Sequence, residues 1–383
     1  MIPLRLLLIT NSLSVGGVET NLVALAQAFQ RRGHRVTVAA ARGPLCELLG
    51  EAIDYAEIPG DRLALWELWR AASEVGRLVR EREIDVIHAF SPRATLICDL
   101  AKHQRIRANG DGHRWPLLIS VPGGLQESPT EWPMTTYCRL LPITRADHIL
   151  IISEEIRRTV RGLPGASSRM VELCHIGLDL QRFHPNGATT TQHLRAELGW
   201  PPESRLIATI GACVPRKSHE LFVRAAGLVV QEYPNARFLV IGEGRLRPEL
   251  TALAKGLGLQ DIVRFLGLRL DVPEIMANLD VYIKPGIVEG FIGITVLEAM
   301  AMAKPVIAFE TEDVKVAIRH DETGLVVPRG DVSAMSRAIL RVLTEPDLAE
   351  KFGRAGRRLV EQEFEVMQVA ERLEQFYRGA LAC

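Results

Sequence analysis

The sequence predicts an α/β protein with two parallel-sheet domains. Short apolar runs of strand length alternate with segments of helical periodicity, and this alternation occurs twice along the chain. With 383 residues, of which 47% are hydrophobic, the chain is long enough for two domains that each bury a core. Its formal net charge is zero, so nothing in its composition attracts nucleic acid.

The first repeat starts with the apolar run from Leu4 to Ile9, which we interpret as a buried strand. The run is too short for a signal peptide or for a membrane span of about 20 residues. Gly16 and Gly17 then lead into a helix, and Gly33 ends this helix before a strand at 35–40, which completes a βαβ unit. Further strands are expected at 86–89, 117–121, 148–152 and 171–175.

The second repeat predicts a helix at 221–231 and strands at 206–210, 238–241, 263–265, 281–283 and 306–309. Between the repeats, the polar segment 183–192 contains proline, asparagine, glycine and a run of threonines, which is typical of a linker. We therefore expect domains at 1–187 and 193–365, followed by a last helix at 366–381.

Two carboxylates flank a glycine-containing loop that opens a helix, from Glu289 to Glu298. The unpaired amides and partial positive charge of a helix start suit a diphosphate. A glutamate one turn into the helix can accept two hydrogen bonds from a ribose diol. An acidic loop followed by a buried helix explains the same residues equally well, because short motifs are often accidental.

A cation pair favours the first interpretation. Arg216 and Lys217 follow an apolar run that ends at Gly211, and two cations can neutralise a leaving diphosphate. Taken alone, the pair is more often a solvated turn before a helix. However, both motifs follow expected strands, and the carboxyl ends of parallel strands lie at one edge of a sheet. Together they predict a nucleotide-sugar site at that edge.

These segments resemble a known family. "GACVPRKSHELFVRAAGLVVQEYPNARFLVIGEG", "VRFLGLRLDVPEIMANLDVYIKPGIVEGFIGITVLEAMAMAKPVIA" and "ETGLVVPRGDVSAMSRAIL" are similar to the donor-binding half of family 4 glycosyltransferases, which are retaining enzymes of the GT-B fold. The amino-terminal half matches more loosely, through "LLLITNSLSVGGVETNLVALAQAFQRRGHRVTVAA", "IDVIHAFSP", "ADHILIISEEIRR" and "CHIGLDLQRFHP". The resemblance covers nearly the whole chain.

The resemblance implies two Rossmann-like domains that face a central cleft, with residues 366–383 returning as a helix to the N-terminal domain. It gives Glu298 the ribose and gives Arg216 and Lys217 the diphosphate. Segment 263–267, with Arg264, would lie beside the nucleobase, and Gly16 and Gly17 would close the site from the acceptor side. The donor sugar and diphosphate would meet Glu289, Gly290, Phe291, Ile292, Gly293 and Ile294. Glu289, Arg216 and Lys217 are the expected catalytic residues.

The implied activity is the transfer of a hexose from a nucleotide diphosphate sugar to a saccharide, lipid-linked or small-molecule acceptor, in surface polysaccharide or glycoconjugate synthesis. No metal or other cofactor is expected, because Arg216 and Lys217 can stabilise the leaving diphosphate. The six cysteines have no close spacing, which favours the reduced cytoplasm over a disulfide framework or a zinc site. We expect at most peripheral association with the inner face of the membrane and predict no oligomeric state.

The chain departs from the family pattern in three places. Eight residues separate Glu289 from Glu298, where the family usually has seven, so Ile292 or a neighbour is interpreted as an insertion. Pro122-Gly123-Gly124 stands where many members carry a histidine, and segment 312–316 replaces a frequent "GGxPE". These departures leave open a non-catalytic nucleotide-sugar-binding subunit and a GT-B sugar-nucleotide epimerase. Hydrolysis of the donor, or a sugar altered without an acceptor, separates the three possibilities.

Overall fold

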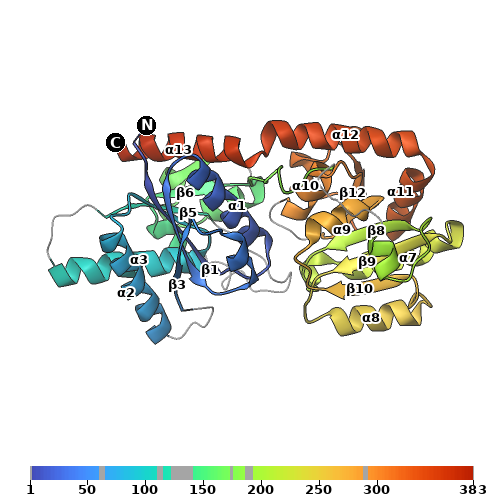
Figure 1. Ribbon diagram of the computed structural model, residues 1–383, viewed down its shortest axis with the longest axis horizontal. Coiled ribbons are helices and arrows are strands. Elements are labelled where there is room, and N and C mark those ends of the chain that lie inside the picture. The colour runs from blue at the N-terminus through green and yellow to red at the C-terminus, as the bar shows by residue number, and fades with distance from the viewer. Residues whose placement is uncertain are drawn as a thin grey trace. The chain divides into compact units, whose positions relative to one another are not determined.

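The computed structural model describes residues 2–59, 65–109, 115–121, 141–172, 176–185, 193–287 and 292–382. These residues form two compact units (Figure 1). The N-terminal domain contains the described residues up to Gly177 together with the C-terminal segment from Val366. The C-terminal domain contains Leu178–Glu365. Most of the predicted linker lies outside the described residues.

The N-terminal domain has a seven-stranded parallel sheet in the order β3-β2-β1-β4-β5-β6-β7. Its strands are β1 (Arg5–Ser12), β2 (Arg35–Ala41), β3 (Asp54–Glu57), β4 (Val86–Ala89), β5 (Leu117–Ser120), β6 (His148–Ile151) and β7 (Met170–Glu172). All but β3 correspond to predicted strands. β3 has the sequence Asp-Tyr-Ala-Glu and lies at an edge of the sheet, half-exposed, so it lacks the apolar run that marks the buried strands.

The C-terminal domain has a six-stranded parallel sheet in the order β10-β9-β8-β11-β12-β13. Its strands are β8 (Arg205–Ile210), β9 (Ala236–Ile241), β10 (Val263–Gly267), β11 (Val281–Lys284), β12 (Val306–Phe309) and β13 (Leu325–Val327). The two parallel sheets confirm the predicted α/β class.

Helices cover both faces of each sheet. The N-terminal domain has α1 (Gly17–Arg31), α2 (Leu65–Glu81), α3 (Pro92–Asn109), α5 (Glu154–Arg161) and α13 (Val366–Ala382). The C-terminal domain has α6 (His193–Glu197), α7 (His219–Glu232), α8 (Arg247–Gly256), α9 (Val272–Asn278), α10 (Ile294–Ala301), α11 (Val332–Thr344) and α12 (Pro346–Glu363). Short 3₁₀ helices include η4 (Pro215–Lys217) and η5 (Val314–Val316). Within the described residues, no helix combines the length and apolar character needed to cross a membrane.

Strand β1 shows how the two faces of a parallel sheet are filled. Leu6 and Leu8 belong to a core cluster with apolar residues of α1 and α13. Leu7 and Ile9 point to the opposite face and belong to a cluster with α2 and α3. Because side chains alternate along a strand, burial on both faces requires the continuous apolar run that the sequence shows.

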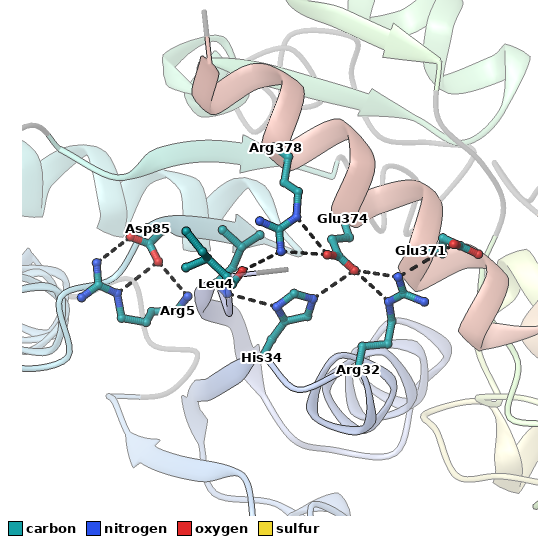
Figure 2. Close-up of polar contacts among 9 residues, drawn as sticks. Leu4, Arg5, Arg32, His34, Asp85, Glu371, Glu374 and Arg378 are labelled. Carbon is teal, nitrogen blue, oxygen red and sulfur yellow. Dashed lines mark hydrogen bonds and ion pairs between the residues drawn. The ribbon is translucent and has the colours of Figure 1, made fainter.

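Helix α13 is held to the N-terminal domain by a buried carboxylate (Figure 2). Glu374 is 3% exposed, and its Oε2 lies 2.7 Å from Nη2 of Arg32 and 3.1 Å from Nε2 of His34. Arg378, one turn further along the helix, lies 2.9 Å from the other carboxylate oxygen. Burial disfavours the charged carboxylate, but these donors outweigh burial and lower the pKa of Glu374 to about 2.

A second buried contact joins the same helix to β4. His88 Nδ1 lies 2.6 Å from the Tyr377 hydroxyl, and both side chains are fully enclosed. Burial lowers the pKa of His88 to about 3, so the imidazole is neutral at physiological pH. The contact places His88 within the core of the N-terminal domain.

Candidate nucleotide-sugar site

The sheet of the C-terminal domain has a switch point between β8 and β11, because β9 follows β8 on one side while β11 pairs with β8 on the other. Open parallel sheets bind ligands at the carboxyl ends of such strands, where the connecting loops separate. A small pocket that opens to solvent lies at this position. Its described lining residues are Thr209, Ile210, Lys217, His219, Tyr282, Lys284, Pro285, Gly286, Gly293 and Thr295.

The loop after β8 presents Lys217 to the pocket. Lys217 ends η4. Ser218 follows it in the left-handed conformation with φ of 49°, and α7 begins at the next residue. A Cβ at Gly211 would lie 3.2 Å from Cε of Lys217, so the glycine leaves room for the lysine stem. The buried His219 joins α7 to this loop, because its Nε2 lies 3.2 Å from the Gly211 carbonyl oxygen.

A second glycine turn supports this loop from β9. Gly242 and Gly244 have φ of 137° and 157°, and a Cβ at either position would clash with the backbone of Gly211 or Cys213. The Cys213 amide donates a 2.8 Å hydrogen bond to the carbonyl oxygen of Glu243. By sequence alone this Gly-Glu-Gly motif is weak evidence, because so short a motif is often accidental. The motif positions the loop that carries Lys217.

The start of α10 forms the opposite side of the pocket. The Tyr282 hydroxyl donates a 2.6 Å hydrogen bond to Oγ1 of Thr295, so strand β11 fixes the first turn of the helix. Gly293 occupies the N-cap position and lines the pocket with Thr295. Amides in the first turn of a helix lack intrahelical partners and favour an anion. Ile292 and Ile294 are buried, so their side chains anchor this turn.

Glu298 lies one turn further along α10 and is 4% exposed. Burial raises the pKa of its carboxyl to about 7, and the positive charge of Arg182 acts in the opposite direction. Glu298 is not among the residues that line the pocket, and its assignment to a ribose stays a prediction.

The other predicted donor residues have different surroundings. Arg216 is half-buried and, unlike Lys217, does not line the pocket. The Arg264 guanidinium lies 5.9 Å from the ring centroid of Trp200 and donates to the carbonyl oxygen of Gln260. The structure thus brings Lys217, Gly293 and the start of α10 together at the pocket. Arg264, on β10, instead contacts Trp200 and Gln260.

Several predicted residues cannot be compared with this pocket. Gly16 and Gly17 belong to the N-terminal domain, where Gly16 caps α1 and Gly17 is its first residue. Glu289, Gly290 and Phe291 lie outside the described residues, as does segment 122–124. Their assignments stay predictions.

A buried ion pair beside the pocket was missed by sequence reasoning. Lys284, at the end of β11, lines the pocket, and its Nζ lies 3.1 Å from Oδ2 of Asp313 and 3.5 Å from the Gly286 carbonyl oxygen. The two side chains are only 5% and 2% exposed. Asp313 precedes η5, within the segment that departs from the family pattern. The carboxylate of Asp313 in this segment could have pointed to the pair, but its partner Lys284 lies far away in sequence, at the end of β11.

Two family models match the chain. The model for Glycosyltransferase Family 4 matches residues 15–182, and the model for Glycosyl transferases group 1 matches residues 190–359. A GDP-mannose-dependent monoacylated alpha-(1-6)-phosphatidylinositol monomannoside mannosyltransferase from Corynebacterium glutamicum is 27% identical over 387 residues, which cover 96% of each chain.

Solved structures share the fold. Anabaena Alr3699/HepE in complex with UDP and glucose has a TM-score of 0.82 at 19% identity, covering 97% of this chain and 99% of that one. Sucrose-phosphate synthase from Thermosynechococcus elongatus has a TM-score of 0.80 at 20% identity, covering 99% of both chains. The two Rossmann-like parallel-sheet domains therefore have the GT-B fold. With both halves matched by family models, the chain belongs to the family 4 glycosyltransferases.

Proposed function

We propose that this glycosyltransferase moves a sugar from a nucleoside diphosphate sugar to a hydroxyl group of a saccharide, lipid-linked or small-molecule acceptor, with retention of the anomeric configuration. The observation that carries the proposal is the pocket between β8 and β11, where Lys217 and the first turn of α10 offer a cation and backbone amides to a diphosphate. The Anabaena Alr3699/HepE complex with UDP and glucose and the GDP-mannose-dependent relative support a nucleotide-sugar donor.

The chemistry needs no nucleophilic side chain. The bond between the anomeric carbon and the distal phosphate oxygen breaks, and the acceptor oxygen bonds to the same carbon on the same face. The acceptor proton passes to the leaving phosphate oxygen. Because negative charge develops on the diphosphate as this bond breaks, Lys217 and the helix amides stabilise the transition state more than the bound donor. This electrostatic assistance is the reason to expect turnover without a metal. A role in surface polysaccharide or glycoconjugate synthesis belongs to the same proposal.

Donor turnover tests the proposal. The purified chain is incubated with UDP-, GDP- and ADP-sugars, with and without saccharide and lipid-linked acceptors, in excess EDTA. We expect release of nucleoside diphosphate that is accelerated by an acceptor and persists in EDTA, and an α-linked donor should give an α-linked product by NMR.

Other outcomes have distinct meanings. Binding without turnover would indicate a non-catalytic nucleotide-sugar-binding subunit, and an altered sugar formed without acceptor would indicate an epimerase. A β-linked product from an α-linked donor would overturn retention. Loss of turnover in EDTA with recovery in magnesium or manganese would overturn the metal-independent mechanism.

A further inference from the structure

We infer that Lys284, positioned by Asp313, is an additional cation for the diphosphate of the donor. The inference rests on the proposed function, because it assigns a residue to the same pocket. It adds a contact from β11 to the one that Lys217 makes from η4. Lys284 is thereby a binding residue, and Asp313 is its positioning residue.

The first argument is location. Lys284 is the last residue of β11, and its side chain lines the pocket at the carboxyl end of the sheet. This is the edge at which a parallel sheet binds ligands. Lys217 reaches the same small pocket from the neighbouring strand connection. Among the described lining residues, two are lysines and none carries a carboxylate, which suits an anion with more than one negative charge.

The second argument is the unusual burial of the pair. A lysine ammonium is rarely buried, because its removal from water costs free energy that only a close partner offsets. Asp313, 2% exposed, supplies that partner at 3.1 Å. A pair of apolar residues would fill the same space without this cost, so the pair is not explained by packing alone. Holding a cation in place at the phosphate site would explain why the pair is buried there.

The third argument is the geometry of the ammonium group. An ammonium carries three N–H donors and no acceptor. Its contact with the Gly286 carbonyl oxygen is 3.5 Å long and therefore at the limit of a hydrogen bond. A phosphate oxygen in the pocket can replace this weak acceptor while Asp313 keeps its contact. The ammonium need not leave its position to bind the ligand.

A double variant tests the inference. Lys284→Met alone would leave the Asp313 carboxylate buried and destabilise the fold, so it is combined with Asp313→Asn, which removes both charges at similar volume. The matched control is Lys304→Met, because Lys304 is also a partly buried lysine of this domain, with its Nζ 2.7 Å from the Ala277 carbonyl oxygen and outside the pocket.

Calorimetry measures the affinities of nucleoside, nucleoside diphosphate and inorganic pyrophosphate for each protein, and thermal melting confirms that each is folded. We expect the double variant to bind nucleoside diphosphate and pyrophosphate at least tenfold more weakly, with nucleoside affinity changed less than twofold. Lys304→Met should leave all three affinities within twofold of wild type.

The outcomes separate this inference from the proposed function. A folded double variant with wild-type diphosphate affinity would overturn the role of Lys284 and leave the donor site intact. Wild-type protein that binds pyrophosphate through Lys284 but no nucleoside diphosphate would support the cation and overturn the nucleotide-sugar proposal. Wild-type protein that binds neither would overturn both.

Discussion

Lys217 is the residue on which the proposed donor site most depends. Its side chain lines the pocket at the carboxyl end of β8, where Gly211 leaves space for it. A hydrogen bond to a charged group contributes about 1.5–3 kcal/mol, so Lys217→Ala should weaken nucleoside diphosphate binding by roughly 10- to 100-fold. Nucleoside binding should stay within twofold, because the ammonium meets phosphate and not the base.

Calorimetry with both ligands measures this difference. Lys255→Ala, which removes an exposed lysine on α8, is the control and should change neither affinity. Equal losses for nucleoside and diphosphate in Lys217→Ala would remove Lys217 from the phosphate site.

Glu298 is predicted to couple nucleotide binding to pH. Burial raises the pKa of its carboxyl to about 7, and hydrogen bonds donated by a ribose diol favour the charged carboxylate. Binding of a nucleoside should therefore release a proton near pH 6. Titration in buffers of different ionisation enthalpy measures this release, which should vanish in Glu298→Gln. A wild-type protein that binds nucleoside without releasing a proton would contradict the ribose assignment.

The same pKa has a consequence for the free protein. Because the folded-state pKa lies above the ordinary value of 4.5, the carboxyl contribution to the unfolding free energy is fully present below pH 4.5. It is lost as the pH rises through about 7. As the pH rises from 4.5 to about 7, wild type should therefore lose unfolding free energy that Glu298→Gln, which does not titrate, retains.

At the scale of the element, helix α13 depends on Glu374. Replacing the carboxylate by an amide removes the negative charge and one of the two acceptor oxygens that Arg32, Arg378 and His34 share. Because Arg32 and Arg378 remain 19% and 28% exposed, we expect Glu374→Gln to cost about 3 kcal/mol, the lower end for a broken buried pair. Denaturant unfolding measures this loss.

A neighbouring carboxylate and the pH dependence of the Glu374→Gln penalty provide two controls. Glu371→Gln removes a neighbouring carboxylate that is 53% exposed and 3.9 Å from Arg32, and it should cost less than about 1 kcal/mol. Since the pKa of Glu374 is lowered, its contribution is present above pH 4.5 and is lost as the pH falls toward about 2. A Glu374→Gln penalty that stays constant between these values would contradict the ion-pair account.

The elements differ in how far the sequence could predict them. Buried strands such as β1 and β8 were predictable, because burial on both faces of a parallel sheet requires continuous apolar runs. The edge strand β3 was not, because its residues are half-exposed. The loop that carries Lys217 was predicted from its glycine and its cations. Its support by Gly242 and Gly244 and the pairing of Lys284 with Asp313 depend on which strands become neighbours, and local patterns do not contain this information.

At the scale of the whole molecule, the two sheets have the same kind of strand order, and each has its switch point beside the first strand of its domain. In the N-terminal domain β1 lies between β2 and β4, and in the C-terminal domain β8 lies between β9 and β11. The pocket lined by Lys217 and Lys284 is in the C-terminal domain. The central claim is therefore that the diphosphate of the donor binds at the switch point of the C-terminal sheet.

Hydrogen exchange tests this claim most directly, because it reports on every backbone amide that a ligand protects. Exchange measured by mass spectrometry with and without saturating nucleoside diphosphate should slow in segment 211–218 and in the first turn of α10, while α2 and α3 of the N-terminal domain stay unchanged. Bound nucleoside diphosphate that leaves segment 211–218 and α10 unprotected, while it slows exchange elsewhere, would contradict the location of the site.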